Sequence, residues 1–477
     1  MMIRSTPACA ARSSTASRSA SKSGSARWAW ASIRVGIILS WQTRLASGVS
    51  SEDKVTLRLP GGFSMTEKLA LDGGIPVRSE PWARWPVWTE QDEQAVVDAI
   101  RSGKWGVGGT RVPELERRFA ELHSAAHGVA CCNGTIALQI ALVAAGIQAG
   151  DEVITTPYTF MATAMAALAV GAVPVFVDVQ EGTHNIDPDL IEAAITERTR
   201  AIYPVHIGGR PADMDRITEI AERRGLVVVE DAAQAWLAEW RGRGVGALGA
   251  AGTFSFQSSK NFSSGEGGIV LSNDEAVFQR AWSYHNCGRK MGGDWYDHVL
   301  PGLNYRLSEL QAAILLSSLD RLVEQQKTRR RAMAVLEQGL AEVDGILVPD
   351  ADERITAHAC HIFMARLDTE KIPVDSKVFT AALQAEGLPA HPGYTTPLYK
   401  QDFWKWFGER STGAGKKWKE VWPRPYDSYE LPVCEKLSRS TIWVKQDVLL
   451  AGPEAMGDVI AAFAKVAAAA RRGALRG

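Results

Sequence analysis

The chain has few cysteines for its length and almost no net charge. Six cysteines are spread over 477 residues, and only Cys131 and Cys132 are neighbours in the sequence. Such spacing does not make a disulfide framework, so we expect a reduced, cytoplasmic protein. The formal net charge of −1 argues against a general nucleic-acid-binding protein.

Long uninterrupted apolar runs are also missing. The longest apolar stretch, residues 160–177, approaches the length of a membrane span, but Gly171 and Pro174 interrupt it and Asp178 follows at once. A buried helix followed by a buried strand explains this stretch better. We therefore expect no association with a membrane.

Acidic residues are absent before Glu52, whereas nine basic residues precede Met65. This Ser-, Ala- and Arg-rich segment resembles a transit peptide or an export leader, although Arg34 breaks its best apolar core. We expect residues 1–64 to be a disordered extension, or to precede a natural start at Met65. In either case they contribute little to the fold.

From residue 89 onward, helical patterns alternate with short strands that are almost entirely apolar. We predict strands at residues 129–132, 152–155, 173–177, 201–205, 226–230 and 251–256. We predict helices at residues 89–103, 113–124, 135–145, 160–170, 188–195 and 214–224. This alternation indicates an α/β protein with a mostly parallel sheet covered on both faces, in which ligands bind beyond the carboxyl ends of the strands.

A long helical pattern follows over residues 307–343. Beyond it we predict strands near residues 361–367 and 442–444, with helices near 378–385 and 455–471. We therefore expect a large domain over residues 65–318 and a smaller C-terminal α/β domain over residues 319–477. The long helix joins them.

Lys260 and Asp231 carry the strongest chemical signal. Lys260 follows a predicted strand and precedes a glycine-rich turn, and Asp231 directly follows another predicted strand. A single lysine at a strand end is more often a solvated residue, but lysine is costly to bury without a partner. A lysine that can form an imine and a buried acid that holds a pyridinium proton are what pyridoxal phosphate requires.

The sequence from Met65 to about Lys465 resembles the DegT/DnrJ/EryC1/StrS family of sugar and aminocyclitol aminotransferases. The matching runs are residues 133–138, 150–154, 157–162, 171–178, 204–208, 230–234, 254–260 and 302–306. The resemblance implies a pyridoxal-phosphate-dependent transferase of fold type I. Such a fold has a large domain with a mostly parallel seven-stranded sheet and a smaller C-terminal α/β domain.

The resemblance implies roles for the residues around the cofactor ring. Lys260 would carry the cofactor and then move a proton between the substrate carbon and the cofactor carbon. Asp231 would pair with the pyridine nitrogen. Phe160 would stack on the ring, and Gln234 would approach its phenolic oxygen.

The resemblance also implies a phosphate site. Gly134 and Thr135, at a helix start, would donate backbone N–H groups to the phosphate, where the helix dipole favours an anion. Ser255 would add a hydroxyl. Asn304 would reach the phosphate from a neighbouring subunit, which implies a homodimer with shared active sites.

Three departures from the family pattern concern the substrate. Trp236 and Cys287 stand where the family commonly has histidine, and residues 445–447 read Lys-Gln-Asp where many members carry a histidine. His391 and Tyr394 match the family's substrate-side loop, so we assign them to substrate binding together with Trp236. The departures leave the amino acceptor open.

The resemblance implies an aminotransferase that moves an amino group from glutamate or glutamine to a keto-sugar or a keto-cyclitol. Such reactions occur in antibiotic and cell-surface sugar biosynthesis. One alternative is a lyase or aromatase of the 3-amino-5-hydroxybenzoate synthase type, which Cys287 slightly favours. Another is a non-enzymatic partner subunit, but such a protein would need neither Lys260 nor Asp231.

Three further signals receive structural interpretations. Residues 244–249 match the dinucleotide-binding fingerprint by letter, but the required flanking strand and helix are missing, so we predict a hairpin turn. Residues 358–361 contain two histidines and a cysteine without a second ligand pair nearby, so we expect no metal. We expect His206 to be a core or pocket residue rather than a base.

Overall fold

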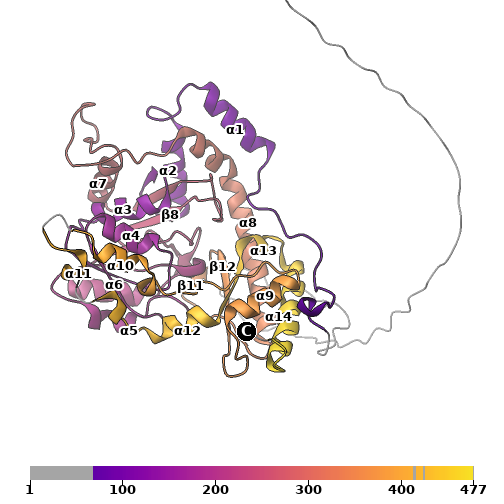
Figure 1. Cartoon of the computed structure of the whole chain (residues 1–477). Coiled ribbons are helices and arrows are strands. Elements are labelled where there is room, and N and C mark those ends of the chain that lie inside the picture. Colours follow the sequence, from indigo (N-terminus) through magenta and orange to yellow (C-terminus); the bar gives the residue numbers. More distant parts are fainter. Residues whose placement is uncertain (1–67, 412–414, 423–424, 476–477) are drawn as a thin grey trace, which may run out of the picture. The chain divides into compact units, whose positions relative to one another are not determined.

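The computed structural model describes residues 68–411, 415–422 and 425–475. The predicted extension, residues 1–64, lies outside the described residues. Within the described part, the strands form one seven-stranded sheet and two three-stranded sheets. Figure 1 shows the arrangement of the helices around these sheets.

The seven-stranded sheet has the order β1-β9-β8-β5-β4-β2-β3. Its strands are β1 (His127–Cys131), β2 (Glu152–Thr155), β3 (Val173–Phe176), β4 (Thr199–Tyr203), β5 (Val227–Asp231), β8 (Ala251–Ser255) and β9 (Gly268–Ser272). All neighbours from β8 to β3 pair in parallel, whereas β9 pairs antiparallel with both β8 and β1. The predicted mostly parallel α/β sheet is therefore confirmed.

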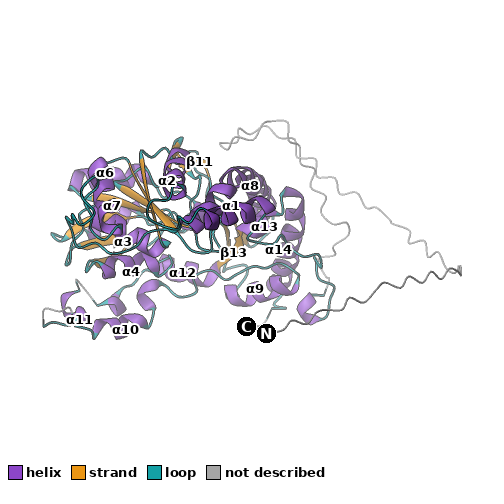
Figure 2. Ribbon diagram, turned by 90° about the horizontal axis from the view of Figure 1, so that it is seen from above, coloured by secondary structure: helices purple, strands orange, loops and turns teal. Residues whose placement is uncertain are grey.

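Helices cover both faces of this sheet (Figure 2). The helices of this part are α1 (Glu90–Arg101), α2 (Arg111–Leu122), α3 (Gly134–Ala144), α4 (Ala162–Ala169), α5 (Pro188–Ile191), α6 (Met214–Arg224) and α7 (Glu275–His285). Strand residues alternate between two buried clusters: Val129 and Cys131 pack with α3, α4 and α7, and Ala130 packs with α2 and α6. This period of two is expected for a sheet that is buried on both faces.

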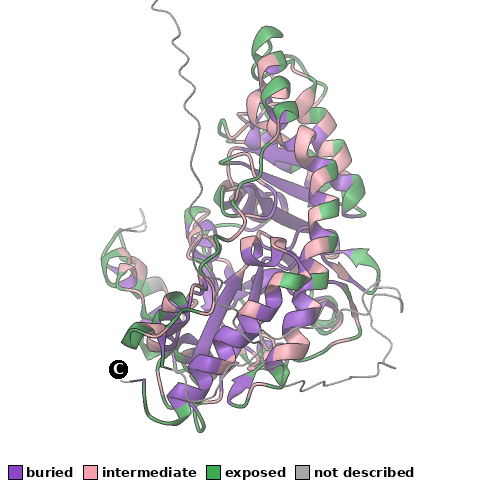
Figure 3. Cartoon of the chain, turned by 90° about the vertical axis from the view of Figure 1, so that its right-hand side faces the viewer, coloured by how far each residue is buried: buried purple, intermediate pink, exposed green. Residues whose placement is uncertain are grey.

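The C-terminal part has a core of its own. Its sheet has the order β10-β12-β13, and η1 (Ala70–Asp72) lies beside α9. The elements are β10 (Ile346–Leu347), β12 (Ile362–Leu367), β13 (Thr441–Lys445), α9 (Ser376–Ala385), α12 (Pro432–Ser440), α13 (Gln446–Leu450) and α14 (Met456–Arg471). Phe363, Phe379 and Phe463 are buried together in this core. Figure 3 shows the buried strands and the inward faces of the helices.

The long helix α8 (Glu309–Ala341) connects the two cores. It contacts α1 near its beginning and α13 and α14 farther along (Figure 1). Its side chains up to Leu322 belong to the core of the large sheet, and those from Ala332 onward belong to the C-terminal core. A domain boundary at residues 318 and 319 remains a proposal; the change of core along α8 falls slightly later, between Leu322 and Ala332.

Some predicted boundaries were wrong. The helix predicted at residues 160–170 begins only at Ala162, because Phe160 and Thr163 close a turn before it. The helix predicted at residues 188–195 is α-helical only to Ile191 and continues as a 3₁₀ helix to Ala194. Strand β9 and helix α7 were not predicted.

The glycine-rich residues 244–249 bind a carboxylate of the protein itself. The strands β6 (Glu239–Trp240) and β7 (Arg243–Gly244) lead into this segment and form a small sheet with β11 (Ile355–Ala357), in the order β11-β6-β7. The N–H groups of Gly246, Leu248 and Gly249 donate to the buried Glu230 carboxylate at 2.7, 2.8 and 2.7 Å. The turn therefore satisfies a buried acid.

His206 also stabilises this acid. Its Nε2 lies 3.0 Å from the Glu230 carboxylate, and its Nδ1 accepts the N–H of Ala212. Burial alone would raise the pKa of Glu230, but His206 and the turn amides hold that pKa below its ordinary value. His206 is thus fully buried and bonded on both ring nitrogens, as a core residue.

An aromatic segment covers the edge strand β3. It comprises α10 (Phe403–Gly408), α11 (Trp418–Val421) and η5 (Tyr426–Ser428). The Tyr426 hydroxyl donates to the carbonyl of Pro174 at 2.9 Å, and Trp404 stacks on Tyr426 with ring centroids 3.7 Å apart. Free backbone groups of an edge strand invite pairing with other chains, so this cover protects them.

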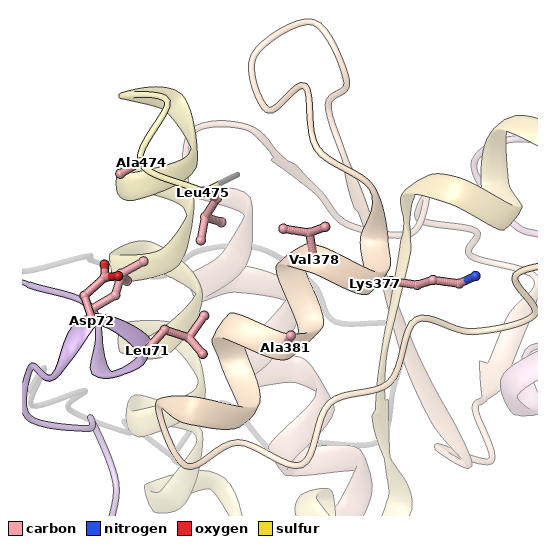
Figure 4. A pocket seen from close by; sticks show the side chains of 8 residues that line it. Leu71, Asp72, Lys377, Val378, Ala381, Ala474 and Leu475 are labelled. Carbon is pink, nitrogen blue, oxygen red and sulfur yellow. The ribbon is translucent and has the colours of Figure 1, made fainter. Parts of the chain in front are cut away.

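No helix among the described residues is both long enough and apolar enough to cross a membrane. A cavity of about 600 Å³ opens between η1, α9 and the end of α14. Figure 4 shows the side chains that line it, including Asp72, Lys377 and Leu475. None of its lining residues belongs to the site predicted from the sequence.

Candidate active site

Lys260 and Asp231 meet where two neighbouring parallel strands end. Asp231 is the last residue of β5 and pairs in register with Thr253 of β8. Lys260 lies on the turn that follows β8. The two side chains are close enough for each charge to shift the pKa of the other.

Asp231 is a buried carboxylate with only 5% of its surface exposed. Its Oδ2 accepts a hydrogen bond from Thr163 Oγ1 at 2.7 Å, and its Oδ1 accepts the N–H of Ala233 at 3.1 Å. Burial raises the pKa of Asp231, and the two hydrogen bonds and the Lys260 charge oppose that shift only in part. A cationic N–H placed against this carboxylate would therefore be stabilised.

Lys260 is half-buried, and its Nζ lies 5.9 Å from the centroid of the Trp236 ring. Burial lowers the pKa of Lys260 to about 8, although Asp231 opposes the shift. An amine with this pKa is partly uncharged near neutral pH. An uncharged amine is required for attack on a carbonyl group.

The lowered pKa predicts the pH dependence of the reactivity of Lys260. At pH 7 an amine of pKa about 8 is roughly one-tenth uncharged, against less than about one part in 1,000 for an ordinary lysine. In cofactor-free protein, reductive methylation of Lys260 should rise with pH and level off above about pH 8. Peptide mass spectrometry measures the extent of methylation at Lys260, with the exposed Lys104 as the reference amine.

The same labelling also tests the coupling to Asp231. The Asp231 carboxylate raises the pKa of Lys260. In an Asp231→Asn variant, the methylation of Lys260 should therefore level off at a lower pH than in the wild type. A midpoint for Lys260 equal to that of Lys104 would contradict the prediction.

A second group of predicted residues surrounds the start of α3. Asn133 caps this helix by accepting the N–H of Ile136 at 2.9 Å. A Cβ atom placed on Gly134 would lie 2.6 Å from Ser255 Cβ and 2.9 Å from its hydroxyl oxygen. Only glycine lets the Ser255 hydroxyl approach the helix start this closely. With the exposed Thr135 next in the chain, this arrangement suits an anion.

Phe160 and Gln234 lie on loops that follow β2 and β5. Phe160 is 62% exposed. Gln234 accepts the N–H of Gly208 at 2.7 Å, and its Nε2 lies 3.5 Å from the Tyr394 hydroxyl. Tyr394 therefore brings the substrate-side loop of the C-terminal part against the large sheet.

The structure places the remaining predicted residues differently. Trp236 has no exposed surface and lies in the core behind Lys260, so direct contact with a substrate stays a prediction. His391 is half-buried, and its backbone pairs with that of Trp443. Asn304 is exposed, and its backbone pairs with that of Asn286. A role of Asn304 at the phosphate depends on a second subunit.

The sequence analysis did not assign to the site two residues that lie close to it. Thr163 anchors Asp231, although it lies one position beyond a matching run. His361, which we interpreted as structural, shares a hydrogen bond of 2.8 Å with Asn261 Oδ1 and packs edge-on against Trp236. Among the described residues, no group of three or more His, Cys, Asp or Glu side chains could hold a metal ion.

These features fit one kind of cofactor, which has a basic ring nitrogen, an aldehyde and a phosphate. Comparison with known sequences agrees, because the profile of the DegT/DnrJ/EryC1/StrS aminotransferase family matches residues 86–443. The chain belongs to this family. It has the fold-type I architecture of the family's pyridoxal-phosphate-dependent aminotransferases.

Individual relatives align with this chain over nearly their whole length. The L-glutamine:2-deoxy-scyllo-inosose aminotransferase of Streptomyces paromomycinus is 38% identical over 86% of this chain and 99% of the relative. The crystal structure of 3-amino-5-hydroxybenzoic acid synthase is 33% identical, with a TM-score of 0.72 over 82% of this chain and 99% of that one.

A third structure, NtdA from Bacillus subtilis, contains bound PMP, the amine form of pyridoxal phosphate. It is 25% identical, with a TM-score of 0.66 over 79% of this chain and 81% of that one. In the present chain, the buried Asp231, Lys260 with its lowered pKa, and the close approach of Ser255 to Gly134 fit this cofactor.

Proposed function

We propose that the chain transfers the amino group of L-glutamine or L-glutamate to a keto-cyclitol of the inosose class, or to a keto-sugar. The proposal rests chiefly on the pairing of Lys260 with Asp231, which a binding scaffold would not need. The relative from Streptomyces paromomycinus supports glutamine as the donor and an inosose as the acceptor. Pyridoxal phosphate supplies the electron-accepting ring on which an amino group is stored between the two half-reactions.

In this proposal Asp231 holds a proton on the ring nitrogen, because its buried carboxylate favours an adjacent cation. Lys260 would accept a proton at its Nζ from the substrate carbon and return it to the adjoining carbon of the cofactor. Its lowered pKa suits this role, since a group that both accepts and returns a proton works best near the working pH. Thr163 orients Asp231 through its hydroxyl.

The other predicted residues would bind and orient. Gly134, Thr135 and Ser255 would hold the phosphate at the start of α3. Phe160 would cover one face of the ring, and Gln234 would face its phenolic oxygen. His391 and Tyr394, with Trp236 behind Lys260, would form the substrate side.

A second candidate is a lyase or aromatase of the 3-amino-5-hydroxybenzoate synthase type. The similarity to that synthase and the presence of Cys287 favour it. Cys287 has a positive φ of 61°, and its Sγ lies 3.5 Å from Arg306 Nη1. It is therefore held in a fixed position beside a cation.

A spectrophotometric screen distinguishes the two candidates. Protein loaded with pyridoxal phosphate should change to the amine-form spectrum when L-glutamine or L-glutamate is added. The amine form should then revert with 2-deoxy-scyllo-inosose or a keto-sugar nucleotide. A protein that completes no half-reaction with either amino acid, but converts an aromatic precursor, would support the lyase instead.

We also propose that the active form is a cytoplasmic homodimer with shared active sites. The described cysteines are all free thiols, as a reducing compartment favours. Large apolar side chains are exposed on the segment before Asn304, with Trp295 54%, Tyr296 84% and Leu303 54% exposed. Exposed apolar groups of this kind are typical of a protein interface.

Mixing two inactive variants tests the shared site. Lys260→Ala lacks the reactive amine, and Asn304→Asp would place a negative charge against the phosphate. If Asn304 acts across the interface, random reassortment should restore about one quarter of wild-type activity, because half of the dimers regain one intact site. Mixtures without any recovery would show that Asn304 does not serve the neighbouring subunit. Sedimentation of each variant confirms that dimers form.

A further inference from the structure

Asn261, the residue that follows Lys260, is a buried amide that bonds to a distant part of the chain. Only 1% of its surface is exposed. Its Nδ2 donates to the carbonyl of Ala359 at 2.8 Å and lies 3.5 Å from Gln326 Oε1, and its Oδ1 is 2.8 Å from His361 Nδ1. Because the carbonyl of Ala359 can only accept, these contacts fix the direction of the amide, and His361 is the donor. The turn that carries Lys260 is therefore attached to the C-terminal part.

Residues 358–361 form a bend between β11 and β12, and this bend is held from several sides. Cys360 is fully buried and has a φ of 52°, which is uncommon for a residue other than glycine. Its N–H donates to His358 Nδ1 at 2.8 Å, and the carbonyl of His358 accepts a bond of 3.0 Å from Gln326 of α8. Such a backbone persists only where its surroundings determine it. The bend is therefore a fixed support for Asn261.

The same bend also bonds to the loop of Gln234. The N–H groups of Ala359 and His361 donate to the carbonyls of Gly209 and Gly208, each at 3.0 Å. The N–H of Gly208 donates in turn to Gln234 Oε1 at 2.7 Å. A Cβ atom on Gly209, where φ is 89°, would lie 2.7 Å from Ala359 Cβ and 2.6 Å from the carbonyl oxygen of Gln234. The bend thus packs against Gln234 with a closeness that only glycine permits.

His361 joins the bend to the surroundings of the Lys260 side chain. Burial lowers the pKa of His361 well below its ordinary value, and the charge of Lys260 lowers it further. The imidazole is therefore neutral near pH 7 and donates from Nδ1 to Asn261. Its ring packs edge-on against Trp236, with centroids 5.5 Å apart, and Lys260 Nζ lies 5.9 Å from the centroid of the same Trp236 ring. The bend thus supports both the backbone and the surroundings of Lys260.

We propose that Asn261 is a positioning residue, which holds Lys260 at a fixed place relative to Gln234 through the bend of residues 358–361. The inference rests on the proposed transamination, because an amine that must reach two adjoining carbons tolerates little displacement. Asn261 touches neither substrate nor cofactor in this role. Its effect on the reaction passes through Lys260.

The reactivity of Lys260 in cofactor-free protein tests the inference without turnover. In Asn261→Ala the turn loses its anchor, and Lys260 should move toward solvent, where its pKa approaches that of an ordinary lysine. The midpoint of its reductive methylation should rise by about half a pH unit, a roughly 3-fold loss of uncharged amine at pH 7. Asn273→Ala should keep the wild-type midpoint. It is the matched control, because Asn273 bonds the backbones of Ala126 and Ala247 beyond the far end of β9.

The histidine partner of Asn261 gives a second comparison. His361→Asn keeps an N–H donor near the position of Nδ1, whereas His361→Leu removes it. His361→Leu should therefore shift the methylation midpoint of Lys260 as Asn261→Ala does, and His361→Asn should keep most of the wild-type behaviour. Should Asn261→Ala fail to fold, these two variants carry the comparison.

Turnover separates positioning from a general loss of structure. In a single turnover with L-glutamine, Asn261→Ala should slow the half-reaction by about 10- to 100-fold. Its affinity for pyridoxamine phosphate, which forms no bond to Lys260, should be unchanged. In a Lys260→Ala background supplied with methylamine, the added Asn261→Ala substitution should cause no further loss, because the amine whose position it controls is already absent.

A wild-type methylation midpoint in both Asn261→Ala and His361→Leu would overturn the inference. A further loss of the same size in the Lys260→Ala background would also overturn it, because Asn261 would then act independently of Lys260. If the wild type never consumes glutamine or glutamate, the proposed transamination fails instead, and the methylation midpoints still decide whether Asn261 positions Lys260.

Discussion

Replacing Lys260 by alanine is expected to lower amino transfer by about 10⁴-fold or more. We expect this loss because Lys260 is the amine that would carry the cofactor and move the proton. Burial lowers its pKa to about 8, which suits both roles. The rate of each half-reaction in a single turnover measures the effect. The variant should still bind pyridoxal phosphate, since Asp231 and the residues around Gly134 remain.

Chemical rescue separates this role from a structural one. A small primary amine such as methylamine should restore part of the proton transfer in Lys260→Ala, because it can occupy the space of the lost amine. Trp236 forms the buried surface behind Lys260, so truncation of Lys260 to alanine should leave the core unchanged. A variant that retains more than about one-hundredth of wild-type activity without added amine would refute the assignment.

The sequence predicted the part of the site that is local in the chain. Asp231 directly follows an apolar strand and Lys260 follows another, and parallel strands bring their carboxyl ends to one edge of a sheet. Gly134 and Ser255 were predicted only through the family resemblance. Their close approach depends on the packing of α3 against β8, which no local pattern reveals.

Contacts between distant segments could not be predicted. Residues 329–331 are three consecutive arginines, yet only Arg329 is fully buried, Arg330 is half-buried and Arg331 is exposed. Which of them faces the boundary between the cores depends on the phase of α8 relative to both sheets. The sequence shows the helix but not this phase, so the buried guanidinium became visible only in the structure.

Strand β9 was missed for a related reason. Gly265, Gly267 and Gly268 make the segment look like a turn, and the antiparallel return that follows is only five residues long. A Cβ on Gly268 would lie 2.6 Å from the carbonyl oxygen of Asn133. This glycine therefore permits a close approach next to the predicted phosphate site, rather than simply ending an element.

Replacing Asp231 by asparagine is expected to lower amino transfer by about 10³-fold, because the amide cannot hold a proton on the ring nitrogen as a carboxylate does. The amide oxygen can still accept the N–H of Ala233, and the amide NH2 can donate to the Thr163 hydroxyl, which then accepts instead of donating, so the position of the side chain should change little. A matched Thr163→Val variant removes only the orienting hydroxyl and should lose about 10-fold. Equal losses in the two variants would contradict the proposed role of the charge.

The same substitution should not destabilise the cofactor-free protein. Burial raises the pKa of Asp231 in the folded state, so on raising the pH the unfolded chain loses this proton first. The carboxylate therefore costs stability as the pH rises from about 4 through its raised folded pKa, and the Asp231→Asn substitution would remove that cost. Thermal unfolding at pH 4 and pH 8 should show the wild type losing more stability than the variant over this interval. The opposite result would mean that Asp231 is retained for folding rather than for its charge at the ring.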